Sequence, residues 1–191
     1  MATSGGAGKD TAADYIVNEL SGGSFVKHAL GAPIHEIADR YCSGKVERHH
    51  LQDFGEQMRR IFGEDVWIRD VDRFIEESEK SVVIPDVRKL IEFAHYRAEK
   101  GYNPLYIKVN EDVAKERLTK RDGGFNQEDL NRSIEGQMCF IEALPTEPVG
   151  NTGLMRVVNM PPFDGVYIVD NSSSLDNFKT QLKQWWGLIN G

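Results

Sequence analysis

Two hydrophobic periods alternate along the chain. Short runs rich in β-branched and aromatic residues, typical of buried strands, cover residues 24–28, 81–85, 105–109 and 166–169. Around them apolar residues recur at three- and four-residue spacing, which predicts helices over 9–20, 33–41, 51–63, 64–79, 90–100, 111–121, 126–144 and 174–189. The strand, helix and strand over 81–109 indicate a parallel βαβ unit. We therefore expect an α/β fold with helices packed on a parallel sheet.

The stretch from Pro145 to Pro162 interrupts this alternation. It is rich in proline, glycine and asparagine, which favour turns. We expect either a mobile insertion or a hairpin over these residues. The chain as a whole has 191 residues, and a chain of this length buries about 70% of its unfolded surface around one core. A single domain over 1–191 is therefore expected.

Composition narrows the class of protein. The net charge of −7 argues against a broad surface for duplex nucleic acid. No apolar run approaches the roughly 20 residues that are needed to cross a bilayer, and the first residues do not resemble a signal peptide. We therefore expect a cytoplasmic protein without a membrane partner, in which Cys42 and Cys139 are free thiols.

The most informative motif is the glycine-rich run TSGGAGKDT over residues 3–11, directly before the first predicted helix. Glycines at 5, 6 and 8 allow backbone conformations that bring N–H groups close to phosphate oxygens. The helix that follows adds unpaired N–H groups and the positive end of its dipole. Lys9 is expected to reach the terminal phosphates of a nucleoside triphosphate, and Thr11 to help hold Mg2+.

The run departs from the phosphate-loop pattern G-x-x-x-x-G-K-[ST] in two positions. Thr3 stands where the pattern has its first glycine, and Asp10 separates the lysine from the threonine. In addition, a phosphate loop normally follows a buried strand, whereas only Met1 and Ala2 precede this run. Either the natural chain begins further upstream, or the sheet is built without a normal central strand. A glycine-rich tail before a helix is the plainer alternative.

A second candidate site follows the strand over 81–85, where the sequence reads Pro85-Asp86-Val87-Arg88. Ligands gather at the carboxyl ends of parallel strands. Asp86 is suited to hold Mg2+ or to position an acceptor, and Arg88 is suited to grip a phosphate with two hydrogen bonds. A structural Asp/Arg turn pair is the alternative. Of Arg59 and Arg60, one is expected to project toward an acceptor phosphate while the other faces water.

A third candidate is the basic run RLTKR over 117–121, with Arg132 beyond a glycine-containing break. Arg117 and Arg121 are four residues apart and share one helix face. Positive groups on a hinged segment suit a small lid, expected over about 117–137, that closes on a transferring phosphoryl group. A solvated charged helix is the alternative. After the last strand, the Asp170-Asn171-Ser172 turn is suited to contact a nucleoside base.

Taken together, these segments resemble the P-loop nucleoside and nucleotide kinase superfamily, and most closely the deoxynucleoside monophosphate kinases of phages and some bacteria. The matching segments include GAGKDTAADYI at 6–16, KHALGAPIHEI at 27–37, VVIPDVR at 82–88 and RLTKRDG at 117–123. They follow one another in the expected order over nearly the whole chain. Dephospho-coenzyme A kinases are similar in the loop, the RLTKRDG segment and the final DNS turn, so they are close rivals.

The resemblance implies a three-layer P-loop kinase fold with a parallel sheet flanked by helices and a small arginine-bearing lid. It implies transfer of the γ-phosphoryl group of ATP to a nucleoside monophosphate, with Mg2+. The residues implied to bind ATP are Gly5, Gly6, Ala7, Gly8, Lys9, Asp10, Thr11 and, near adenine, Asn171. The acceptor would be held by Arg59, Asp86 and Arg88, and the metal by Thr11 and Asp86. Charge on the transferring group would be stabilised by Lys9, Arg88, Arg117, Arg121 and Arg132.

Three functional hypotheses follow from these residues. The leading one is an ATP-dependent (deoxy)nucleoside monophosphate kinase, and the second is a dephospho-coenzyme A kinase. The third is a degenerate P-loop protein that binds a nucleotide or a partner without catalysis. For the two kinases the partners are small-molecule nucleotides, whose base preference is not predicted. The apolar helix over 174–189 is either core or interface, so a homodimer remains an open alternative.

Overall fold

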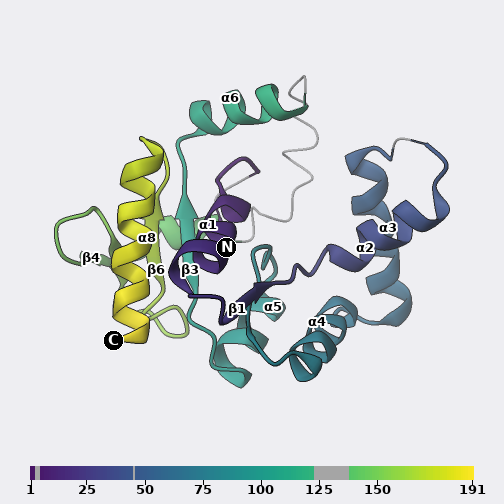
Figure 1. Ribbon diagram of the computed structural model, residues 1–191, viewed down its shortest axis with the longest axis horizontal. Coiled ribbons are helices and arrows are strands. Elements are labelled where there is room, and N and C mark those ends of the chain that lie inside the picture. Colours follow the sequence, from purple (N-terminus) through teal and green to yellow (C-terminus); the bar gives the residue numbers. More distant parts are fainter. Residues whose placement is uncertain (3–4, 45, 123–137) are drawn as a thin grey trace.

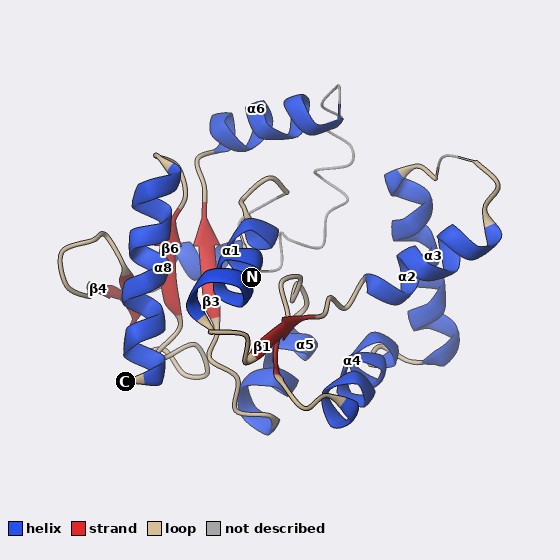
Figure 2. Cartoon of the chain, in the orientation of Figure 1, coloured by secondary structure: helices blue, strands red, loops and turns tan. Residues whose placement is uncertain are grey.

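The computed structural model describes residues 1–2, 5–44, 46–122 and 138–191 (Figure 1). The α-helices are α1 Lys9–Tyr15, α2 Ala32–Tyr41, α3 Arg48–Phe62, α4 Val66–Glu77, α5 Leu90–Ala94, α6 Glu111–Asp122 and α8 Leu175–Asn190. Two π-helical turns, η1 Ile16–Leu20 and η2 His95–Glu99, continue α1 and α5, and η4 Cys139–Ala143 is a 3-10 helix. The strands are β1 Phe25–Lys27, β2 Ser81–Val83, β3 Leu105–Lys108, β4 Thr146–Pro148, β5 Met155–Val157 and β6 Tyr167–Asp170. The chain is an α/β protein in which helices surround short strands (Figure 2).

Local sequence signals explain several helix ends. The helix predicted over 9–20 is confirmed, because α1 begins after Gly8 and η1 continues it without a break. Pro33 lies in the first turn of α2, where its missing N–H group costs no hydrogen bond. Ser174 caps α8, since its side chain accepts a hydrogen bond from the backbone N–H of Asn177.

The strands form two sheets rather than one parallel sheet. β1 pairs in parallel with β2, and β3 pairs in parallel with β6, to which β5 and β4 add antiparallel pairs. The predicted βαβ unit over 81–109 is therefore wrong in one respect: β2 and β3 do not pair. β6 occupies one edge of β3. Along the other edge, Met1 and Ala2 are the only described residues, and Ala2 forms a parallel bridge with Ile107. Two residues are too few to join both sheets.

The region after α6 differs from the prediction in two ways. Residues 145–162 form the hairpin that was one of the two alternatives, and its strand β5 joins the second sheet through β6. The predicted helix over 126–144 lies largely outside the described residues. Its described end is the short 3-10 helix η4 and not an α-helix. Burial of Met138 and Ile141, which are 1% and 0% exposed, fixes this turn through tertiary packing that no periodic pattern reveals.

Three apolar clusters hold the elements together. The first joins α1, η1 and α8 to the second sheet, with Phe178, Leu182 and Trp185 as buried members from α8. The second surrounds Tyr106 and includes Phe93 from α5 and Ile141 from η4. The third packs α4 against η2 and contains Leu30, Trp67, Ile68, Val71 and Tyr96. The closing helix α8 is therefore a core helix along one face.

Helices α2, α3 and α4 lie between β1 and β2 in the sequence. α2 packs on α3, and α3 contacts α4. α2 and α3 project away from both sheets, whereas α4 lies beside β1 (Figure 1). Across the ranges that the structure describes, no helix is both long enough and apolar enough to span a bilayer. Cys42 and Cys139 are both exposed, and no disulfide joins them to another described residue.

Candidate phosphate-binding site

Residues 5–8 form a tight loop that leads directly into α1. Gly6 and Gly8 have φ angles of 77° and 96°, a region that disfavours residues with a Cβ atom. A Cβ on Gly6 would lie 3.0 Å from the carbonyl oxygen of Ala114, and a Cβ on Gly8 would come closer than 3.0 Å to the Asn171 side chain. The loop therefore requires glycine at both positions, because its backbone packs closely against α6 and Asn171.

Asn171 connects this loop to the second sheet. It directly follows β6, is 5% exposed, and donates its backbone N–H to the carbonyl oxygen of Lys108 at 2.8 Å. Its side-chain amide donates to the carbonyl oxygen of Ala7 at 2.9 Å. These bonds hold the loop at the carboxyl ends of β3 and β6, the edge where ligands bind in parallel sheets. The implied place of Asn171 near adenine stays a prediction, and the contact with Ala7 was not foreseen.

Arg117 reaches the same place from α6. Its Nη2 atom lies 3.5 Å from Oδ1 of Asn171, at the outer limit of a hydrogen bond. Its Nη1 atom is buried and has no hydrogen-bond partner in the described part of the chain. A buried N–H group without an acceptor costs free energy, and a phosphate oxygen is the acceptor that a guanidinium group fits best. Arg121 lies one turn further along α6 and is exposed, and Arg132 lies outside the described residues.

The first turn of α1 carries the remaining candidates of the loop. Lys9 is half-buried and Thr11 is exposed. Among the described residues, no side chain caps the N-terminus of this helix, which suits an anion at that end. Asp10 points elsewhere, since its carboxylate lies 3.5 Å from Nζ of Lys27 on β1. Lys27 donates a shorter hydrogen bond, of 2.6 Å, to Asp14, and this bond raises the pKa of Lys27.

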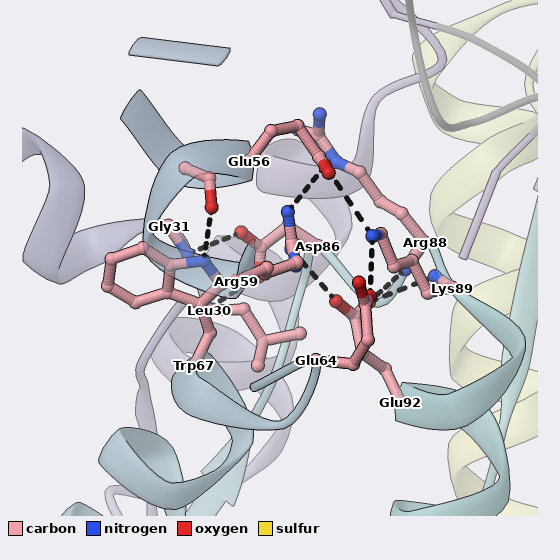
Figure 3. A network of polar contacts seen from close by, with 11 residues as sticks. Leu30, Gly31, Glu56, Arg59, Glu64, Trp67, Asp86, Arg88, Lys89 and Glu92 are labelled. Carbon is pink, nitrogen blue, oxygen red and sulfur yellow. Dashed lines mark hydrogen bonds and ion pairs between the residues drawn. The ribbon is translucent and has the colours of Figure 1, made fainter. Parts of the chain in front are cut away.

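Asp86 lies at the second candidate site, after β2. One carboxylate oxygen accepts the backbone N–H of Leu30 at 2.7 Å and the other accepts that of Gly31 at 2.9 Å (Figure 3). These bonds hold the segment that follows β1 against the segment that follows β2. Asp86 therefore has a structural role in addition to any part in ligand binding.

Glu92 brings the two predicted arginines of this site together. It is 2% exposed, and its Oε2 atom accepts the backbone N–H groups of Arg88 at 2.8 Å and Lys89 at 2.9 Å. Its Oε1 atom lies 3.3 Å from Nη2 of Arg59 (Figure 3). Sequence reasoning missed Glu92, although a glutamate three residues after a helix N-cap is the spacing of a capping box.

The charges around Glu92 form a compact network. Arg59 is also paired with Glu56, at 2.8 Å, and Lys89 pairs with Glu64 at 3.0 Å. The side chain of Arg59 is only 10% exposed, while Arg60 is exposed. Arg60 therefore faces water and Arg59 turns inward, while the projection of Arg59 toward an acceptor phosphate stays a prediction. An acceptor phosphate at Arg59 would have to share that guanidinium group with two carboxylates.

A Mg2+ ion would find a partial set of ligands here. In the described ranges, no three His, Cys, Asp or Glu side chains gather as a metal cluster. In phosphoryl-transfer sites, however, Mg2+ takes one or two protein ligands and completes its shell with phosphates and water. The exposed hydroxyl of Thr11, in the first turn of α1, fits such a role. Asp86 fits it less well, because each of its oxygens already accepts a backbone hydrogen bond.

No protein-family model matches the chain, and no curated protein is significantly similar to it. The glycine loop, Arg117 and the network around Glu92 are therefore the observations from which a function is inferred.

Proposed function

We propose that this chain is an ATP-dependent kinase that transfers the γ-phosphoryl group to a (deoxy)nucleoside monophosphate and forms the diphosphate. The proposed frame is a three-layer P-loop kinase fold. The observation that carries the proposal is the buried Nη1 atom of Arg117, which lacks a described hydrogen-bond partner and belongs to a residue packed beside the glycine loop. A guanidinium group in this position calls for an anionic ligand.

The donor side would consist of the loop, the first turn of α1 and Arg117. Backbone N–H groups of residues 5–8 and the positive end of the helix would face the phosphates of ATP. Lys9 would place its charge at the terminal phosphates, and Arg117 would approach them from α6. Mg2+, held by the phosphates and Thr11, would neutralise charge on the β- and γ-phosphate oxygens.

The acceptor side would consist of the residues that follow β2. Arg88 and Arg59 meet at Glu92, and both are partly buried. A monophosphate held there would face the donor from a second strand end. Phosphoryl transfer depends mainly on this kind of positioning and charge neutralisation, and little on covalent chemistry by the protein.

A coupled ATP-consumption assay with Mg2+ tests the proposal, with dAMP, dCMP, dGMP, dTMP and dephospho-coenzyme A as acceptors. Turnover with at least one monophosphate is expected. Lys9→Met should lower kcat about 100- to 1,000-fold, because a positive charge at the developing transition state is lost. Lys183→Met, at an exposed position of α8, is the matched control and should leave kcat unchanged.

Two results would replace the proposal. Turnover with dephospho-coenzyme A alone would assign the chain to that rival activity. ATP binding without any phosphorylated product would favour a non-catalytic nucleotide-binding protein. Near-normal turnover by the Lys9→Met variant would show that the glycine loop is not the donor site.

A further inference from the structure

The carboxylate of Glu56 contacts two cations that are largely buried (Figure 3). Its Oε1 atom lies 2.8 Å from Nη1 of Arg59 and 3.5 Å from Nζ of Lys89. The side chains of Arg59 and Lys89 are 10% and 12% exposed, whereas that of Glu56 is 43% exposed. The Glu56 carboxylate is therefore the accessible member of the group, and it covers both cations.

The two cations converge on one point, because both contact the same oxygen atom of Glu56. We call this point the Arg59–Lys89 site. A guanidinium group and an ammonium group that face the same position form a site for an oxyanion. A tetrahedral phosphate in place of the carboxylate would offer an oxygen to each of them.

Lys89 is a member of this site that the sequence did not indicate. Its backbone N–H donates to Oε2 of Glu92 at 2.9 Å, so its position at the start of α5 is fixed. Its Nζ atom also lies 3.0 Å from Glu64. An ammonium group has three N–H donors, so Lys89 is able to keep Glu64 and to bind a phosphate oxygen as well.

The two carboxylates that pair with Arg59 differ in how firmly they are held. Glu92 is 2% exposed and accepts two backbone N–H groups in addition to its contact with Arg59. Removing such a buried anion from its partners is costly. Glu56 is more exposed and contacts both cations through one oxygen, and exposed ion pairs contribute little stability. Glu56 is therefore the carboxylate that a ligand is able to displace.

Displacement of Glu56 requires no movement of the backbone. Glu56 and Arg59 are three residues apart on one face of α3, so rotation of the Glu56 side chain alone carries its carboxylate into water. A phosphate monoester has about two negative charges at neutral pH and would be repelled by a carboxylate at the same place. Exchange removes this repulsion, and the phosphate then shares Arg59 with Glu92 alone.

We propose that the Arg59–Lys89 site binds the phosphate group of the acceptor in exchange for the Glu56 carboxylate. Glu56 occupies the site in the absence of acceptor and moves into water when the phosphate enters. Lys89 is thereby a further substrate-binding residue, and Glu56 lowers the affinity for the acceptor. The inference rests on the acceptor side of the proposed function, and it is independent of ATP and of the glycine loop.

An NMR titration of the full chain, without ATP or Mg2+, tests the exchange. The ligands are inorganic phosphate, dAMP, dCMP, dGMP and dTMP, and the corresponding nucleosides serve as controls without a phosphate. The dissociation constant comes from the amide signals, and shifts at the backbone N–H groups of Arg88 and Lys89, which Glu92 accepts, locate the ligand. Phosphate-bearing ligands should bind and move these signals, and the nucleosides should not.

Three variants separate the members of the site. Glu56→Gln should tighten phosphate binding about three- to tenfold, because the competing charge is lost. Glu76→Gln removes the same charge from an exposed position of α4 and should leave the dissociation constant unchanged. Lys89→Met should weaken binding about ten- to a hundredfold, because a charge-assisted hydrogen bond is lost. The thermal midpoint checks that each variant folds, and Glu56→Ala gives the same test if Glu56→Gln does not fold.

Several results would overturn the proposal. Equal or weaker binding by Glu56→Gln would show that Glu56 does not compete with the phosphate. Binding that Lys89→Met leaves unchanged, or shifts confined to the glycine loop, would place the phosphate elsewhere. Inorganic phosphate that binds as tightly as every monophosphate would keep the site and assign it to free phosphate instead of a nucleotide. The expected binding without any kinase turnover would refute the proposed function and support the Arg59–Lys89 site.

Discussion

Replacing Gly8 by alanine tests the fit between the glycine loop and Asn171. The φ angle of 96° lies in the left-handed region, where a residue with a Cβ atom costs about 1–2 kcal/mol. The added Cβ would also come closer than 3.0 Å to the amide of Asn171. That amide must then give up its 2.9 Å bond to Ala7, at a further cost of about 1–1.5 kcal/mol. The free energy of unfolding should therefore fall by about 2–4 kcal/mol.

Asn171→Ala separates the two causes. Alone it removes the bond to Ala7 and should cost about 1–2 kcal/mol. In the double variant the clash is gone, so the loss should be smaller than the sum of the single losses by about 1 kcal/mol. Urea denaturation is followed by circular dichroism for the original protein, the two single variants and the double variant. Together the four free energies of unfolding form a double-mutant cycle. Gly187→Ala is the control, since a Cβ there meets nothing within 4 Å. Replacing a helical glycine by alanine should raise the free energy of unfolding by about 0.5–1 kcal/mol.

The reasoning is refuted if the single losses add within about 0.5 kcal/mol in the double variant. Additivity would mean that the Asn171 amide does not press on the loop at Gly8. The strain at φ 96° would then be the whole effect.

Three further predictions concern single side chains. Glu92→Ala removes the acceptor of two buried backbone N–H groups and one of the two carboxylates paired with Arg59, and should lower the free energy of unfolding by about 3–5 kcal/mol. Glu116→Gln, an exposed control, should not change the urea midpoint. Asp86→Asn replaces one of two acceptor oxygens by an amide donor and should lower the free energy of unfolding by about 1–3 kcal/mol. An unchanged urea midpoint would argue that the hydrogen bonds from Asp86 to residues 30 and 31 do not stabilise the fold. Burial raises the pKa of Tyr96, so above about pH 10 the unfolded state loses a proton that the folded state keeps, and stability falls as pH rises. Tyr96→Phe should make this fall shallower, and an equal slope in both proteins would contradict the assignment.

The positions of most described helices and strands could be predicted because they depend on local periodicity, whereas the turn η4 could not. β2 and β3 both fall within runs of apolar, β-branched and aromatic residues, and α1 with η1 follows an unbroken helical pattern. The separation of the sheets could not be predicted in this way. It depends on what lies between β2 and β3, and the described contacts there join Met1 and Ala2 to Leu105 and Ile107, which lie far from them in the sequence.

The candidate site was predictable to a similar degree. Glycines beside a lysine indicated the loop, and the loop takes the positive φ angles that such glycines permit. The residues that hold the loop in place could not be predicted from local sequence, because Asn171 and Ala7 are separated by nearly the whole length of the chain. Glu92 was missed for a different reason. A charged residue in a helix is usually exposed, and nothing local shows that this carboxylate is buried by Arg59 and two backbone N–H groups.

The bonds from Asp86 to Leu30 and Gly31 have a mechanical consequence. β1 and β2 are parallel neighbours in one sheet, so the segment that follows β1 toward α2 and the segment that follows β2 toward α5 leave from the same edge. Asp86 fastens the segment between β1 and α2 to the segment that carries Arg88. α2 and α3 project from this attachment (Figure 1), and Arg59 of α3 makes a second link, to Glu92. The projecting helices are thus joined to the segment after β2 at two places, so a rotation of α2 and α3 as a unit would have to break these links or carry Arg88 with it.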